Sequence, residues 1–249
     1  MIALNVQPDE MSFMTSETRK QLDENLNSIH DRIARACLVS GRSVDEVTLI
    51  AVTKYAELDW VRELIELGVR ELGEARPQQL VSRARELPEE IRWHLIGHLQ
   101  RNKADEILPF TQMIHSVDSV RLFEHLAKCA IKRQSKPKIL LEVNVSGEQS
   151  KDGFDPTELL TAWPKLQTCD SLEISGLMTM APLGDNVEIA RPVFRRLREL
   201  CDRLRAESEG RWLLPQLSMG MSGDFEVGIE EGATLIRLGS CLFEGLSTD

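Results

Sequence analysis

The feature that most constrains the fold is a regular alternation of short strand-like runs with amphipathic helical runs, from about residue 48 onward. The strand-like runs have the length of buried strands, and several have their apolar residue types. The predicted strands are Thr48–Thr53, Arg70–Glu74, Arg92–Gly97, Met113–Val117, Lys138–Val145, Leu172–Met178, Gln216–Met219 and Leu235–Leu238. Apolar residues at helical spacing fill the gaps, as in Leu122, Leu126 and Cys129. Repeated strand–helix units of this kind predict parallel strands.

Eight strand–helix units favour a closed (β/α)8 TIM barrel over an open doubly wound sheet, whose usual strand count is roughly five or six. The chain of 249 residues has no Pro-, Gly- or Ser-rich linker long enough to divide it. We therefore expect one α/β domain over residues 1–249. The chain ends shortly after the eighth strand, which leaves little room for a final covering helix.

Residues 16–40 supply a candidate for that missing cover. The apolar residues at helical spacing in this stretch are Leu22, Leu26, Ile29, Ile33 and Cys37. Thr18 and Gln21 have the spacing of a capping box, and Gly41 is placed to end the helix. We expect this leading helix to pack beside the barrel, between the first and last strands.

Composition and charge exclude several classes of protein. The formal net charge of −10 argues against a nucleic-acid partner, because a phosphate backbone is bound by concentrated Lys and Arg. No apolar run approaches the roughly 18 residues of a spanning helix, and residues 1–14 lack the pattern of a secretory signal. The five cysteines form an odd set without close pairs, which suits a reducing compartment. We expect a cytoplasmic protein that binds neither nucleic acid nor membranes.

Two segments rich in small residues follow the seventh and eighth strands, where barrels of this type often bind phosphate. Residues 218–224 read Ser-Met-Gly-Met-Ser-Gly-Asp and lead into a short helical run at 225–231. Residues 237–240 read Arg-Leu-Gly-Ser. Glycine lets the backbone approach an anion closely, and amides and hydroxyls donate hydrogen bonds to it. Each segment alone also fits an ordinary turn, but together they favour a phosphate site.

Lys54 follows an apolar strand whose end lies at the same rim as both segments. A lysine that ends a buried strand loses hydration, which favours imine formation with an aldehyde. Strands one, seven and eight are close neighbours in a closed barrel, so a ligand with an aldehyde and a phosphate can bridge them. Pyridoxal 5′-phosphate (PLP) is such a ligand. Arg237 either faces its ring nitrogen or forms a salt bridge with a carboxylate of the barrel.

Other polar residues give weaker signals. His94 and His98 lie on a strand and its turn rather than on one helical face, so their spacing does not favour zinc. We expect ordinary histidines at the barrel rim and no metal site. A cluster of polar residues at the end of the fifth strand either closes a site or only supplies hydrogen bonds within a loop. The residues are Asn144, Ser146, Glu148, Ser150 and Lys151.

Lys54 and the two segments belong to a longer series of motifs. In chain order the motifs are Ala51–Lys54, Leu72–Glu74, Trp93–Lys103, Asn144–Ser146 with Ser150–Gly153, Gly176–Met178, Leu217–Ser222 and Arg237–Ser240. With these motifs the sequence closely resembles the pyridoxal phosphate homeostasis protein family, whose barrel is like the amino-terminal domain of alanine racemase. The motifs cover the chain from about residue 48 to its end.

The resemblance implies that Lys54 forms a Schiff base with PLP and that Arg237 approaches the pyridine nitrogen. It implies that the phosphate is bound by the two loops, which contribute Ser218, Gly220, Met221, Ser222, Gly239 and Ser240. The chain departs from the family at Ala75, where relatives usually have asparagine, and at Glu244, which interrupts a usual Phe–Gly pair. Loss of the asparagine amide is expected to change the affinity or the orientation of the cofactor.

The resemblance favours a protein that binds the cofactor and delivers it to PLP-dependent apoenzymes, without catalytic residues. We expect this protein to be a monomer. A guanidinium beside the ring nitrogen weakens the cofactor as an acceptor of electrons. A racemase also needs a second acid/base group on the opposite face of the substrate, and the only tyrosine, Tyr55, directly follows Lys54. Two alternatives remain open: a weak amino-acid racemase or lyase, and a phosphosugar enzyme that forms an imine with its substrate.

Overall fold

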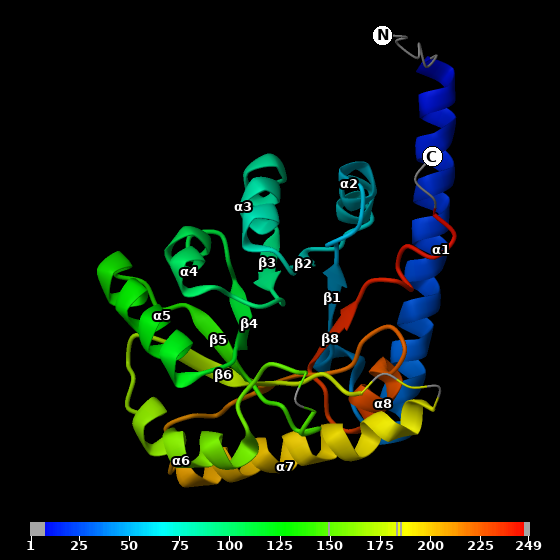
Figure 1. Ribbon diagram of the computed structural model, residues 1–249. Helices are drawn as coiled ribbons and strands as arrows, with labels where there is room; N and C mark the ends of the chain where they lie inside the picture. Colours follow the sequence, from blue (N-terminus) through cyan, green and yellow to red (C-terminus); the bar gives the residue numbers. More distant parts are fainter. Residues whose placement is uncertain (1–7, 149, 183, 185, 247–249) are drawn as a thin grey trace.

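Eight parallel strands close into a barrel, each paired with the next and the last paired with the first (Figure 1). The computed structural model describes residues 8–148, 150–182, 184 and 186–246. The strands are β1 (Thr48–Val52), β2 (Glu71–Glu74), β3 (Arg92–Leu95), β4 (Met113–Val117), β5 (Lys138–Glu142), β6 (Glu173–Met178), β7 (Gln216–Ser218) and β8 (Leu235–Leu238). All eight lie within the runs predicted from the sequence, so the predicted (β/α)8 fold is confirmed.

Helices pack on the outside of the barrel. They are α1 (Pro8–Ser40), α2 (Leu58–Glu66), α3 (Pro77–Glu86), α4 (Arg101–Ile107), α5 (Val120–Arg133), α6 (Pro156–Leu166), α7 (Arg191–Glu207) and α8 (Phe225–Glu230), with the 3-10 helices η1 (Val44–Glu46) and η2 (Val187–Ala190). The apolar stripe predicted for α5, at Leu122, Leu126 and Cys129, is buried. Among the described residues, no helix has both the length and the apolar character needed to cross a bilayer.

The strands bury residues on both faces, because helices cover the outside and a second apolar cluster fills the inside. The members of the inner cluster are Ile50, Met113, Leu140, Met178 and Leu235, each from a different strand. Several polar side chains of the strands are buried as well, including His94, His115 and Arg237. Since the interior of such a barrel is packed, ligands bind at its end, where the loops that follow the strands meet.

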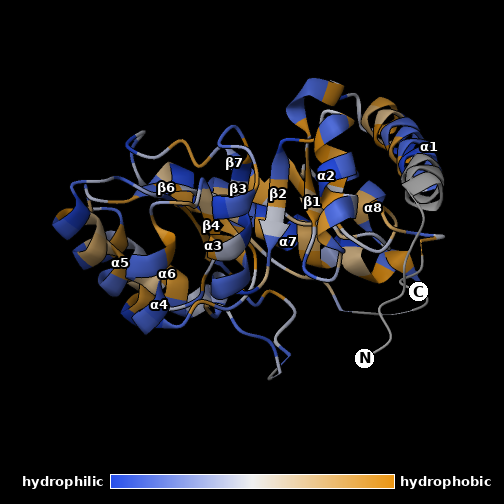
Figure 2. Cartoon of the chain, turned by 90° about the horizontal axis from the view of Figure 1, so that it is seen from above, coloured by the Kyte–Doolittle hydropathy of each residue, from blue (hydrophilic) through white to orange (hydrophobic). Residues whose placement is uncertain are grey.

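Helix α1 occupies the place predicted for it, at the side of the barrel next to β1 and β8. It packs against α8 and α2, and Figure 2 shows the three helices together at one edge of the molecule. Its apolar face is buried, with Leu22 and Ile29 almost inaccessible. Asn25 Nδ2 donates to the carbonyl oxygens of Leu242 and Glu244, each at 2.9 Å. The helix therefore also holds the chain that follows β8 against the barrel.

The start of α1 differs from the prediction. The helix begins at Pro8, so Thr18 and Gln21 lie inside it and the predicted capping box is wrong. The side-chain amide of Gln21 donates instead to Asn25 Oδ1, one turn later, at 3.0 Å. Capping-box spacing marks a helix start only where the preceding backbone is not helical, and here the preceding residues continue the helix.

Two glycines hold backbone geometries that other residues rarely adopt. Gly41 ends α1 with φ +68°, and the N–H of Arg42 donates to Cys37 O at 2.9 Å, so the predicted glycine stop is confirmed. Gly176 lies in β6 with φ +156°, where the pairing of β5 with β6 shifts register. A Cβ atom at this position would lie 1.8 Å from Gln216 O. Glycine at position 176 therefore allows β6 to pair closely with β7.

Candidate ligand-binding site

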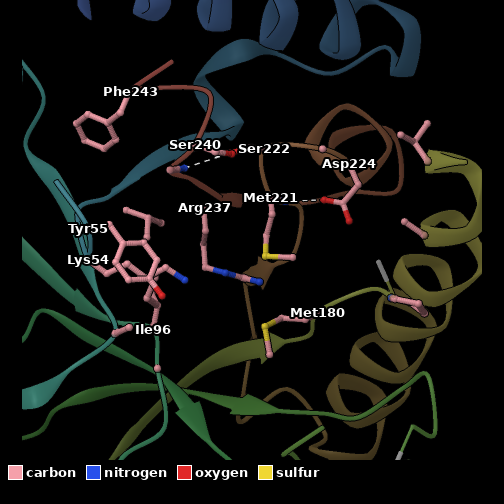
Figure 3. Close-up of a pocket in the computed structure, with 18 of the residues that line it drawn as sticks. Lys54, Tyr55, Ile96, Met180, Met221, Ser222, Asp224, Arg237, Ser240 and Phe243 are labelled. Atoms are coloured by element: carbon pink, nitrogen blue, oxygen red, sulfur yellow. Dashed lines mark hydrogen bonds between the residues drawn. The ribbon is translucent and has the colours of Figure 1, made fainter. Parts of the chain in front are cut away.

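A cavity of about 800 Å³ opens at the carboxyl ends of the strands, the end at which barrels of this fold bind ligands. Six of the eight site residues predicted from the sequence line it (Figure 3); they are Lys54, Met221, Ser222, Arg237, Gly239 and Ser240. They belong to β8 and to the turns that follow β1, β7 and β8. The fold thus brings the lysine, the arginine and both loops to one cavity.

Lys54 directly follows β1, and its side chain is half-buried. Its Nζ lies 5.0 Å from the centre of the Tyr55 ring. Figure 3 shows the side chains of Lys54 and Arg237 extending into the same space. Within the described ranges, the amine has no hydrogen-bond acceptor and no ion-pair partner. It is therefore accessible to a ligand that enters the cavity.

A buried network fixes the turn that carries Lys54. Glu74, at the end of β2, is fully buried, and burial raises the pKa of its carboxyl. Its Oε1 accepts hydrogen bonds from Thr53 Oγ1 at 2.6 Å and from Arg83 at 2.7 Å. Arg83 also donates to the carbonyl oxygens of Thr53 and Ala56. The backbone on both sides of Lys54 is thereby tied to α3, which restricts where the amine can lie.

The loops after β7 and β8 are joined to each other at Ser222. The Ser222 hydroxyl accepts hydrogen bonds from the backbone N–H groups of Gly239, at 3.2 Å, and Cys241, at 3.4 Å. Within the first loop, the N–H of Met221 donates to Asp224 Oδ1 at 2.6 Å (Figure 3). These bonds hold the two loops in one arrangement at the cavity wall.

Three backbone amides of these loops remain available to a ligand. They are the N–H groups of Ser222, Gly223 and Ser240, which have no hydrogen-bond acceptor in the part of the chain that the structure describes. All three residues line the cavity. Adjacent unpaired amides at a cavity wall are donors for an anion such as a phosphate group.

The other two predicted site residues do not reach the cavity wall. Ser218 is fully buried, and its hydroxyl contacts Arg237 Nη1 and His115 Nδ1. Gly220 has φ +96°, and a Cβ atom there would lie 2.9 Å from Cα of Phe225. Gly220 allows the loop to turn closely over the start of α8. Alternate residues of a strand point to opposite faces, and the side chain of Ser218 points into the barrel. Ser218 therefore lies behind Arg237, on the side away from the cavity.

Arg237 lines the cavity and is almost wholly buried. Its Nη1 donates to Ser218 Oγ, and its Nη2 donates to Thr179 O at 3.0 Å. Burial lowers the pKa of the guanidinium to about 10, so the group is still charged at neutral pH. Among the described residues, no carboxylate forms an ion pair with it. The salt bridge considered from the sequence is therefore replaced by bonds to a hydroxyl and a carbonyl.

The sequence patterns do not single out Glu142, which lines the same cavity and is almost fully buried. Burial, and after it the negative charge of Asp118, raises the pKa of its carboxyl to about 7. One signal was present, because a charged residue at the carboxyl end of an apolar barrel strand points to the ligand-binding rim. The polar motif Asn144–Ser146 indicates a function for the loop after β5 rather than for Glu142.

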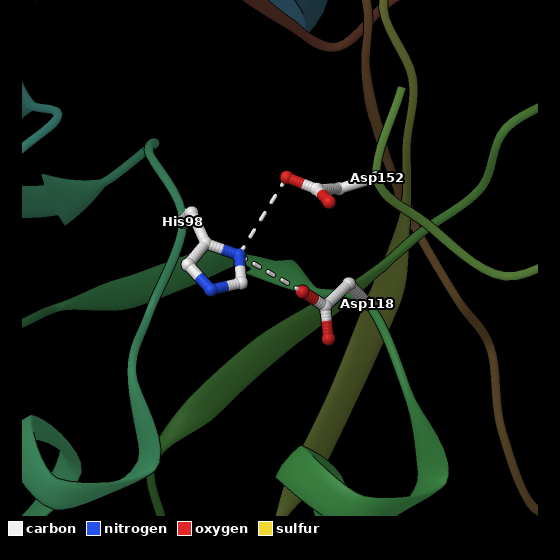
Figure 4. A group of neighbouring side chains, drawn as sticks. All are labelled: His98, Asp118 and Asp152. Atoms are coloured by element: carbon white, nitrogen blue, oxygen red, sulfur yellow. Dashed lines mark ion pairs between the residues drawn. The ribbon is translucent and has the colours of Figure 1, made fainter. Parts of the chain in front are cut away.

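His94 and His98 lie in different places. His94 is buried in the barrel with Nε2 2.7 Å from Glu71 Oε2, so the rim position predicted for it is wrong. His98 lies at the rim, with Nδ1 3.2 Å from Asp118 Oδ2 and 3.6 Å from Asp152 Oδ2 (Figure 4). These three residues are of types that bind metal ions. Because the side chains of His98 and Asp152 are 55% and 64% exposed, the contacts are those of a solvated ion-pair cluster.

The chain matches one protein family over most of its length. Residues 21–247 match the family model described as alanine racemase, N-terminal domain. The pyridoxal phosphate homeostasis protein of Aquifex aeolicus is 38% identical over 221 residues, which cover 88% of this chain and 96% of that protein. The protein of the same name from Mus musculus is 34% identical over 236 residues, which cover 88% of this chain and 84% of that protein.

Solved structures agree with this match. PipY of Synechococcus elongatus is 35% identical, and the superposition covers 86% of this chain and 99% of PipY. The TM-score is 0.78 for PipY without PLP and 0.75 for PipY with PLP bound. An alanine racemase of Clostridium difficile, 14% identical with a TM-score of 0.68, shares the fold over 92% of this chain and 58% of its own. By the match to its family model and by its identity to these relatives, this chain belongs to the pyridoxal phosphate homeostasis protein family, with the barrel of the alanine racemase N-terminal domain.

Proposed function

We propose that this chain binds PLP as a Schiff base on Lys54, buffers it in the cytoplasm and delivers it to PLP-dependent apoenzymes. Family membership supports the ligand, since PipY, 35% identical to this chain, has a structure with PLP bound. The observation that carries the proposal is the convergence of an accessible amine, unpaired amides and a guanidinium on one cavity. These groups suit an aldehyde, a phosphate and a pyridine nitrogen, respectively.

The two loops fit the phosphate group of the cofactor. The N–H groups of Ser222, Gly223 and Ser240 supply donors without a protein acceptor among the described residues. Gly239 supports this role, because its lack of a side chain lets a ligand approach the backbone closely. Met221 belongs to the same wall. We therefore retain these residues as phosphate-binding candidates and place Ser218 and Gly220 behind them.

Arg237 supports a binding role rather than strong catalysis. A charged guanidinium facing the pyridine nitrogen keeps that nitrogen unprotonated, which weakens the ability of the cofactor to accept electrons from a substrate carbanion. Tyr55, the residue type that a racemase uses opposite its lysine, is 77% exposed and lies beside Lys54. It is not positioned as a second acid/base group.

The proposal is tested first by absorption spectroscopy. Protein incubated with PLP is expected to show a visible band that borohydride removes, and Lys54→Ala is expected to lack it. The exposed Lys136 supplies a matched control, since Lys136→Ala is expected to keep the band. An equal band in Lys54→Ala and wild type contradicts the proposed role of Lys54.

Delivery is tested separately. Loaded protein is mixed with a PLP-dependent apoenzyme, and recovery of that enzyme's activity is followed beside an equal concentration of free PLP. We expect transfer from the wild-type protein. Incubation of loaded protein with single amino-acid enantiomers is expected to leave their optical purity unchanged, and rapid racemisation would instead support the enzyme alternative.

A further inference from the structure

A continuous series of hydrogen-bonded side chains leads from the cavity into the barrel. We call it the interior chain; its members, in order, are Arg237, Ser218, His115, His94 and Glu71. Beyond the first bond, the three heavy-atom distances are 2.8, 2.9 and 2.7 Å. The five residues come from five different strands, so no single stretch of sequence reveals the series.

Burial limits the protonation states that the residues of the interior chain can adopt. Ser218 and His115 are fully buried, and His94 is 3% exposed. Burial holds the pKa of His115 well below its ordinary value, so this imidazole is neutral. A neutral imidazole has one N–H donor and one acceptor nitrogen. Since both nitrogens of His115 are bonded, one bond must be donated and the other accepted.

We propose that every hydrogen bond of the interior chain is donated in the same direction, from Arg237 toward Glu71. We propose also that the series of bonds positions the guanidinium at the cavity. A guanidinium has no acceptor. Ser218 Oγ therefore accepts from Arg237 and donates its own proton to His115 Nδ1. His115 then donates from Nε2 to His94 Nδ1, and His94 donates from Nε2 to Glu71. Every buried donor in the series has an acceptor.

The last member is suited to end such a series. Although burial acts to raise the pKa of the Glu71 carboxyl, the hydrogen bond from His94 and the hydrogen bond and charge of Arg92 lower it overall. The group is therefore a carboxylate at neutral pH. A carboxylate only accepts hydrogen bonds, as a guanidinium only donates them, so the two ends of the interior chain impose the same direction.

The opposite direction leaves a buried proton without a partner. If His94 carried two protons, its Nδ1–H would donate to His115, and His115 Nδ1–H would donate to Ser218. The Ser218 oxygen would then accept two bonds, and its hydroxyl proton would have no acceptor in the described part of the chain. A buried hydroxyl that donates no hydrogen bond destabilises the folded state, because it loses the hydrogen bond that it donates to water in the unfolded chain.

Ser218 and His115 are, on this account, positioning residues for Arg237. The guanidinium is held at two points, by the Ser218 hydroxyl and by Thr179 O, which together fix its plane. The effect of this positioning on a ligand rests on the proposed function, in which Arg237 contacts the pyridine nitrogen. The direction of the hydrogen bonds is independent of the proposed function, because it follows from the protein's own donors and acceptors.

The direction is tested on protein without PLP. Histidine labelled with ¹⁵N gives long-range proton–nitrogen NMR spectra that distinguish the two neutral tautomers from the cation. Replacing His30, His98 and His125 by glutamine leaves only the two histidines of the interior chain. We expect both to be neutral with the proton on Nε2 at pH 7. A proton on Nδ1 of either ring, or a cation at His94, overturns the proposal.

The positioning role is tested with Ser218→Ala. Loss of one bond to Arg237 is expected to weaken PLP binding about tenfold and to shift the absorption band of bound PLP. Ser116→Ala is the matched control, because it removes another buried hydroxyl, bonded to Gly97 O, outside the interior chain. Equal affinity and spectra for the two variants overturn the positioning role. If wild-type protein binds no PLP, the proposed function fails, and the NMR result still decides the direction.

Discussion

At the scale of single residues, Glu142 has the most consequential environment. Its carboxyl lines the cavity and is almost fully buried, and burial raises its pKa to about 7, although the charge of Arg237 acts to lower it. The carboxyl is neutral in mildly acidic solution and becomes a buried charge in mildly alkaline solution. The protein must then hold that charge with little hydration, which costs stability.

The raised pKa predicts a specific dependence of stability on pH. A carboxyl whose pKa is higher in the folded state contributes stability below the ordinary value of 4.5, and this contribution is lost as the pH rises to about 7. The loss amounts to about 3 kcal/mol. Urea unfolding at several pH values should show wild type losing stability relative to Glu142→Gln across this window. The exposed Glu89→Gln variant should follow wild type, and parallel profiles for Glu142→Gln and wild type would contradict the assigned pKa.

Ala75 also belongs to the residue scale. It lines the cavity and is half-buried, at the position where the family resemblance implies an asparagine, whereas Glu244 is exposed and outside the cavity wall. Ala75→Asn adds an amide that can bond the cofactor, so PLP affinity is expected to rise about tenfold. Equilibrium titration measures the change. Ala75→Leu has a side chain of similar shape without the amide, and an equal gain for this variant would rule out a hydrogen bond as the cause.

At the scale of elements, α1 has a double role. It covers the side of the barrel beside β1 and β8, and through Asn25 it binds the segment that follows the second loop. The buried face of the helix was readable from its period, because apolar side chains recur on one side. Its true start at Pro8 was not readable, since the polar residues before Thr18 do not interrupt a helix.

The packing of α1 is tested by Ile29→Ala. Ile29 is 2% exposed, and removing a side chain of this size from a packed core costs about 2–5 kcal/mol. Leu38→Ala on the same helix is the control, because Leu38 is 81% exposed and its loss is expected to cost at most about 0.5 kcal/mol. Urea unfolding should give one transition, since we propose a single domain. Equal costs for the two variants would contradict the packing.

At the scale of the whole molecule, the barrel could be predicted because some of its strands, such as β1 and β5, contain buried apolar runs that alternate along the chain with amphipathic helical runs. The cavity could be predicted in part, since loops of small residues and a lysine follow particular strands. The interior chain could not, because His94, His115 and Ser218 meet only after the barrel closes. The same reason applies to Glu142, whose pKa is raised by burial in the closed barrel and then by the charge of Asp118 from another strand–helix connection.

The whole molecule is also expected to be a monomer. Among the described residues, the large exposed apolar side chains form small, separated groups, such as Leu38 with Val39 on α1, Ile131 on α5 and Val187 with Ile189 on η2. The net charge of −10 adds repulsion between copies. Sedimentation equilibrium should therefore give 28.2 kDa at micromolar concentration. A mass twice as large, unchanged on dilution, would show a stable dimer instead.

We propose that the amine of Lys54 forms the covalent link to PLP. The most direct measurement is peptide mass spectrometry of protein that has been loaded with PLP, reduced with borohydride and digested. We predict one dominant pyridoxyl phosphate adduct, on the peptide that contains Lys54, with fragment ions that place it on this residue. An adduct that is absent, or that lies mainly on other lysines, would contradict the account.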